Sequence, residues 1–188
     1  MRKVVLLVVI LAFFSCKEQK TEDIATTVSA LDSQTKKEAY LLSIFQDDQK
    51  VRDDKKEHEI LKRNNFDYQT QEYKAYLKKV HITDSLNFIK IKTYLERFGF
   101  PDFKPTNELA LHAFNTVLMH QPTYEKQLQL FPYLYQGYKE GKIPKEKFSF
   151  LLNNMHRHKY GKSYPHAKTD EENIKQLLKK LELISKSR

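Results

Sequence analysis

The sequence predicts an all-α protein in which residues 37–188 form a single multi-helix bundle of about six or seven helices. Apolar residues recur at intervals of three and four, which is the spacing of one face of an α-helix. The chain has 12 Phe, 11 Tyr and no Trp, and its 4 Gly leave few positions that favour a break. A segment of this length is the size of one domain.

The first helix is expected over residues 36–63, and turn-forming Asn64 and Asn65 end it. Its apolar face is formed by Leu41, Ile44, Phe45 and Val51.

A second and a third helix are expected before residue 99. The second is marked by Tyr73, Tyr76, Leu77 and Val80. The third begins near Thr83, whose hydroxyl can cap a first turn that carries Asp84. No Gly or Pro separates the two, so one continuous helix is an open alternative. Gly99 can take the left-handed position at the end, and Pro101 cannot continue a helix.

Proline and threonine residues mark the ends of the next two expected helices. Pro105 opens a fourth helix and Pro122 closes it. Thr123 can cap a fifth helix that extends to Gly141, with Pro132 inside it as a kink or a restart.

The last two helices follow Pro144 and Thr169. Pro144 has the favoured position at the start of a sixth helix. Thr169 and Glu172 have the spacing of a capping box for a seventh. The narrow apolar stripe of this final helix can pack on the bundle, pair with a partner or lie on a headgroup surface.

The N-terminus resembles the signal of a bacterial lipoprotein precursor. Arg2 and Lys3 precede the uncharged run Val4–Phe14, which has the length of a secretory signal and is too short to span a bilayer. Phe13-Phe14-Ser15-Cys16 then resembles a lipobox, in which the cysteine receives diacylglycerol. Cys16 is the only cysteine, so no internal disulfide can form. An ordinary cleaved signal with an incidental cysteine is the alternative.

This signal predicts three segments and a location. Residues 1–15 are the signal peptide, residues 16–36 are the lipidated cysteine with a disordered tether, and residues 37–188 are the helical domain. The tether is expected because its composition buries little apolar surface. The mature chain is then exported and held by membrane lipid through Cys16 in the bacterial cell envelope.

The mature chain is basic. Removal of residues 1–15 takes away Arg2 and Lys3 and no acid, which lowers the net charge from +9 to +7. Export argues against nucleic acid as a partner, and the positive charges are spread over every segment. An envelope protein, a glycan or an anionic ligand is the expected partner.

Polar side chains interrupt the apolar faces of the first and third helices. Asp48 and Arg52 continue the face of the first helix, with Gln49 beside them. They form either a local ion pair or part of an inward-facing polar cluster. Asp84 and Asn87 lie one turn apart, and Asp84 is expected to start its helix.

Three further polar residues complete the candidate cluster: His120, Gln121 and Tyr160. The chain resembles a family of bacterial helical domains of unknown function in the order of its elements, which are Asp48-Gln49-x-x-Arg52, Asp84-x-x-Asn87, Gly99-Phe100-Pro101, His112 through His120-Gln121, and Tyr160-Gly161. That family has DQxxR, DxxN, GWP, HQ and YG elements. Phe100 replaces the family's Trp, and the glutamines and threonine around the YG element are missing here. The resemblance groups these residues without naming a reaction.

Two functions follow as hypotheses. The first is a non-catalytic envelope module that binds or interacts with a partner. The alternative is a hydrolase or transferase that uses Arg52, Asp84 and His120 between helices. No cofactor is expected, and no metal is expected because the sequence has neither an H-E-x-x-H motif nor a cysteine pair. The absence of a phosphate loop and of a G-x-S-x-G motif leaves nucleotide hydrolysis and serine esterase chemistry without local support.

Overall fold

The computed structural model describes residues 22–184 and confirms the all-α class. The signal peptide and Cys16 lie outside this range. Within this range the chain forms no strand. It contains seven helices, labelled α2 to α8, and residues 22–29 form a further short helical segment before them. The helices are α2 (Gln34–Val51), α3 (Asp54–Arg63), α4 (Gln71–Phe98), α5 (Leu109–Met119), α6 (Tyr124–Lys139), α7 (Lys145–Tyr160) and α8 (Asp170–Lys180).

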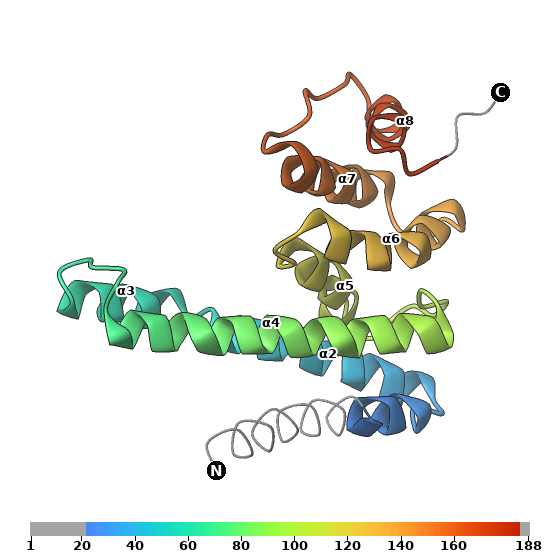
Figure 1. Ribbon diagram of the computed structural model, residues 1–188. Helices are drawn as coiled ribbons and strands as arrows, with labels where there is room; N and C mark the ends of the chain where they lie inside the picture. Colours follow the sequence, from blue (N-terminus) through green and yellow to red (C-terminus); the bar gives the residue numbers. More distant parts are fainter. Residues whose placement is uncertain (1–21, 185–188) are drawn as a thin grey trace, which may run out of the picture.

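The helices form one bundle with a projecting end. α2 and α4 lie side by side as the base, and α5, α6, α7 and α8 are stacked on it in turn (Figure 1). α3 packs only near the start of α4, at the end of the base that projects away from the stack (Figure 1). No helix in the described part of the chain is both long and apolar enough to span a bilayer.

Two separate apolar cores stabilise this arrangement. The large core joins all the helices except α3 and contains fully buried Ile44, Ile91 and Leu118. The small core lies between α3 and the start of α4, and it is formed by Ile60, Leu61, Tyr73, Tyr76 and Val80. We call residues 54–83, which contain α3 and the start of α4, the arm, and the rest of the described chain the body.

The expected first helix is two helices. Arg52 has φ −102° and ψ 56°, which lies outside the helical region, and it ends α2. Asp53 then starts α3, because its carboxylate accepts hydrogen bonds from the amides of Lys55 and Lys56. The carboxylate of Asp53 competes with the backbone carbonyls of α2 for these amides, so a new helix starts instead of α2 continuing.

The expected second and third helices are one helix, α4, of 28 residues. The open alternative of a continuous helix is therefore confirmed, and Asp84 lies inside α4 rather than at a helix start. Gly99 ends α4 as predicted, but its φ of 69° and ψ of −166° differ from the left-handed helical conformation that was expected. The next residue, Phe100, lies against Gly137 of α6, where an added Cβ would meet its ring at 2.8 Å.

Helix α5 begins later than expected, at Leu109. The amides of Thr106 and Asn107 donate to the carboxylate of Glu38, at 3.0 and 2.7 Å. These bonds to α2 hold the segment after Pro105 as a loop.

The remaining helix ends agree with the sequence. Thr123 and Thr169 cap α6 and α8 by accepting from the amides three residues ahead. Pro132 is accommodated inside α6, and Gly161 ends α7 in the left-handed conformation at φ 72°. α8 packs on α7 and buries Ile174, Leu177 and Leu178, which confirms packing for its apolar stripe.

The expected boundary between tether and domain at residue 37 is wrong. Residues 22–29 are helical, and Val28 and Leu31 are buried, with Leu31 in the large core. Ser33 then caps α2 through its hydroxyl. Two apolar contacts and a cap order a segment whose composition is polar, so the domain includes at least residues 22–36.

Candidate functional site

A network of charged side chains joins α2 to α4 at the root of the arm. Asp48 is 1% exposed, and its Oδ1 accepts from Nη1 of Arg52 at 2.5 Å. The other guanidinium nitrogen, Nη2, donates to Oδ1 of Asp84 at 2.6 Å. One guanidinium thus lies between two carboxylates from different helices, a fork geometry for which arginine is suited.

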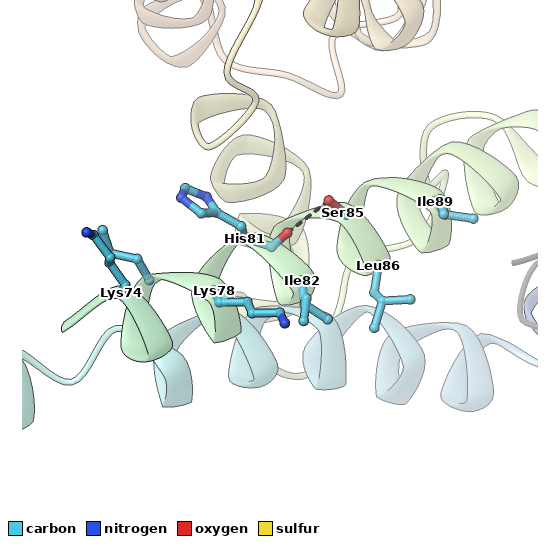
Figure 2. Close-up of a pocket in the computed structure, with 8 residues that line it drawn as sticks. Lys74, Lys78, His81, Ile82, Ser85, Leu86 and Ile89 are labelled. Atoms are coloured by element: carbon cyan, nitrogen blue, oxygen red, sulfur yellow. Dashed lines mark hydrogen bonds between the residues drawn. The ribbon is translucent and has the colours of Figure 1, made fainter. Parts of the chain in front are cut away.

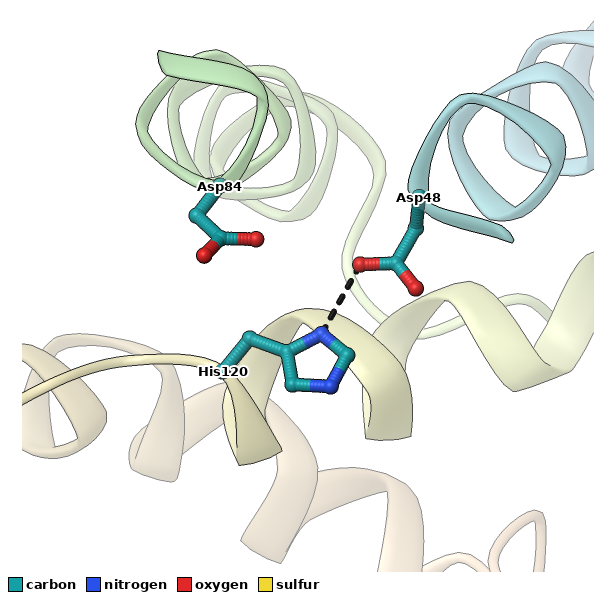
Figure 3. A group of neighbouring side chains, drawn as sticks. All are labelled: Asp48, Asp84 and His120. Atoms are coloured by element: carbon teal, nitrogen blue, oxygen red, sulfur yellow. Dashed lines mark hydrogen bonds and ion pairs between the residues drawn. The ribbon is translucent and has the colours of Figure 1, made fainter. Parts of the chain in front are cut away.

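His120 adds a third helix to this network. It ends α5, and its Nδ1 lies 2.8 Å from Oδ1 of Asp48 (Figure 3). A carboxylate only accepts hydrogen bonds, so Nδ1 carries the proton in this pair. The second ring nitrogen, Nε2, has no hydrogen-bond partner among residues 22–184. The imidazole is 30% exposed, so Nε2 can meet water.

The two amide side chains near the ion network have different roles. Gln49 donates from Nε2 to Oδ2 of Asp48 at 3.0 Å and so satisfies the second carboxylate oxygen. Asn87 is buried and donates to the carbonyl of Ile44 at 3.3 Å, which fastens α4 to α2. Its Oδ1 has no partner among the described residues. Gln49 therefore belongs to the network, and Asn87 is a neighbouring helix contact.

Gln121 and Tyr160 do not join the network. Gln121 follows the end of α5, is buried, and donates back to the carbonyl of Val117 in that helix. Tyr160 lies at the end of α7, and its hydroxyl donates to the carbonyl of Lys180 at 2.9 Å. The expected convergence of Tyr160 with Arg52 is therefore wrong, because sequence order alone places no residue of α7 beside α2. The adjacent Gly161 has a structural role as the left-handed end of α7.

The position of the network follows from the helix contacts. α2 contacts both α4 and α5, so the end of α2, the middle of α4 and the end of α5 meet at one point. Apolar residues of the large core, such as Ile44 and Phe88, lie on one side along the chain. Val80 of the small core and Val51, which packs against that core, lie on the other. The network therefore occupies the joint between body and arm.

Three side chains that could ligate a metal ion lie together at this joint, which the sequence did not predict. One ligand atom each from Asp48, Asp84 and His120 lies within 4.8 Å of the others (Figure 3). Oxygen and imidazole ligands of this kind suit a divalent cation. However, Arg52 donates to both carboxylates, so its positive charge already holds the position of a cation. The residues fit a guanidinium better than a metal ion.

Comparison of the chain with models of known protein families, with curated proteins and with solved structures finds no match. The resemblance to a family of bacterial helical domains therefore stays a prediction. The fold and the joint must be interpreted from their own geometry.

Proposed function

We propose that the chain is an exported lipoprotein, anchored in the bacterial envelope through Cys16, whose helical domain is a non-catalytic binding module. The uncharged run before a lone cysteine supports the anchor. The observation that supports a non-catalytic domain is the mutual pairing of the charged groups at the joint.

This pairing leaves the joint little capacity to bind a ligand. Both guanidinium nitrogens of Arg52 that point to the joint already donate to carboxylates. An anion would have to displace Asp48 or Asp84, and the remaining carboxylate would repel it. The network is best explained as a structural contact that holds α2, α4 and α5 together. The partner, which is an envelope protein, a glycan or an anionic ligand, is then bound elsewhere on the domain.

A hydrolase or transferase is the second candidate, because of the pair formed by Asp48 and His120. A carboxylate that holds Nδ1 leaves Nε2 as the basic nitrogen, the arrangement used by general bases. Nε2 has no hydrogen-bond partner among the described residues, and the 30% exposure of the ring lets it reach water.

Two measurements test the proposal. The anchor is tested by the mass of the protein from its native host, where Cys16 should carry diacylglycerol and a Cys16→Ser variant should leave the membrane fraction. An unmodified thiol would overturn the anchor.

The domain's role is tested with single alanine substitutions of Arg52, Asp84 and His120. We expect each variant to lose several degrees of melting temperature, with any growth defect of the host following that loss. If His120→Ala removes function while the melting temperature stays at the wild-type value, His120 belongs to a functional site, and the structural role of the joint is wrong for this residue. Tyr160→Phe is the matched control, because it removes a hydroxyl far from the joint.

A further inference from the structure

The outer face of α4 carries an apolar surface with a basic rim. A hollow of about 520 Å³ lies along this face, and every residue that lines it comes from α4 (Figure 2). We call this surface the α4 face, and its residues are Lys74, Leu77, Lys78, His81, Ile82, Ser85, Leu86 and Ile89. From its first to its last residue the face is about 22 Å long at 1.5 Å per helical residue.

The composition of the α4 face is unusual for a solvated helix. Ile82 is 49% exposed, and Leu86 and Ile89 extend the apolar strip along the axis. Lys74 and Lys78 are exposed at one end, and the lining contains no acid. A polar helix face normally shows mixed charge, whereas an apolar strip with lysines is typical of helices that lie on a membrane surface.

The position of the anchor limits how far this domain can stand from the bilayer. Residues 17–21 separate Cys16 from the first described residue, Glu22. Even a fully extended chain of that length spans only about 20 Å. A lipidated Cys16 would therefore hold the domain within one domain diameter of the headgroups.

We propose that the α4 face docks on the surface of the bilayer that holds Cys16. Ile82, Leu86 and Ile89 enter the boundary between headgroups and acyl chains, and Lys74 and Lys78 contact the phosphates of anionic lipids. This inference rests on the proposed lipid anchor and adds a second membrane contact to it. It fixes the orientation of the domain, with α4 parallel to the membrane and the stack of α5 to α8 on the opposite side of α2 and α4.

Charge favours a lipid surface over a second copy of the chain. A two-fold dimer through the α4 face would bring two sets of lysines into one interface without an acid in the lining to pair them. An anionic bilayer supplies the opposite charge along the whole face.

The test uses the full lipidated chain with a dye on the α4 face. Cys16 is the only cysteine and its sulfur is blocked by lipid, so an Ile82→Cys substitution gives a single site for an environment-sensitive fluorophore. Phe150→Cys on α7, another exposed apolar position, is the matched control. The protein is placed in vesicles of phosphatidylethanolamine and phosphatidylglycerol, and nitroxide-labelled lipids serve as quenchers.

We expect blue-shifted emission that is quenched at position 82 and not at position 150. Neutralising Lys74 or Lys78 to Gln should lower the ratio of docked to undocked protein about five-fold each, the effect of one basic side chain near an anionic surface. Lys175→Gln on α8 should change nothing.

Two outcomes would overturn the proposal: equal quenching at both positions, and a dye at position 82 that lipid nitroxides do not quench. In the second case, a blue shift would mean that protein covers the face. Mass analysis of the same sample separates the two proposals. If Cys16 carries lipid and docking is absent, only the docking is wrong.

Discussion

Replacement of Asp48 by alanine tests the joint most directly. Asp48 accepts hydrogen bonds from Arg52, His120 and Gln49, so its loss leaves three nitrogen donors facing an apolar methyl group. Removal of one partner from a buried ion pair destabilises a protein by about 3–5 kcal/mol. Arg52 and His120 are 24% and 30% exposed and can recover some hydration, so we expect a loss of about 2–3 kcal/mol.

That loss corresponds to a fall in melting temperature of about 5–10 °C for a chain of this size. Circular dichroism during heating and urea unfolding measures it. Asp48→Asn keeps the shape and one acceptor oxygen, so its loss should be smaller. The matched control is Asp32→Ala, which removes an exposed pair with Lys36 and should change stability by less than about 0.5 kcal/mol. If the losses for Asp48→Ala and Asp32→Ala are equal, the joint does not stabilise the fold.

Three other predictions concern packing, ionisation and metal binding. Gly137→Ala should destabilise the fold by about 1–3 kcal/mol in urea unfolding, because the new Cβ meets the ring of Phe100 at 2.8 Å; unchanged stability would contradict that close packing. Burial raises the pKa of Tyr40 and of Tyr94, so the folded state keeps both protons above the unfolded pKa of about 10. The contribution of these two phenols to stability is then fully present below pH 10 and is lost as the pH rises further, and their ionisation, followed by absorbance at alkaline pH, should accompany unfolding. Arg52→Ala should let Zn²⁺ raise the melting temperature, whereas the same addition leaves the wild type unchanged; an equal response of both proteins would show that the guanidinium does not occupy the cation position.

Local signals predicted the helix ends well. Thr123 and Thr169 each cap a helix through their own hydroxyl, and Gly99 ends α4 through its own backbone. Such signals depend on residues within one turn, so the sequence contains them. The break at Arg52 was missed because no Gly or Pro marks it, although Asp53 was a local signal that a second helix starts there.

Contacts between distant residues were harder to predict. The pair of Asp48 and Arg52 follows from helical spacing, but the contacts with Asp84 and His120 depend on how α4 and α5 pack on α2. Tyr160 was grouped with them by order in the chain, and the packing of α7 on α8 places it elsewhere. The burial of Leu31 likewise comes from tertiary contact with the large core, which no pattern in a polar segment reveals.

Because the two apolar cores are separate, we expect the arm to unfold before the body. The arm is held by the small core between α3 and α4, whereas the body shares its apolar residues among many helices. Fewer buried contacts mean a smaller opening free energy, so backbone amides of α3 should exchange with solvent while those of α5 stay protected. α4 runs through both the arm and the body without a break. If α3 unfolded, the start of α4 would therefore lose its packing partner and fray, while the rest of α4 would stay packed in the body.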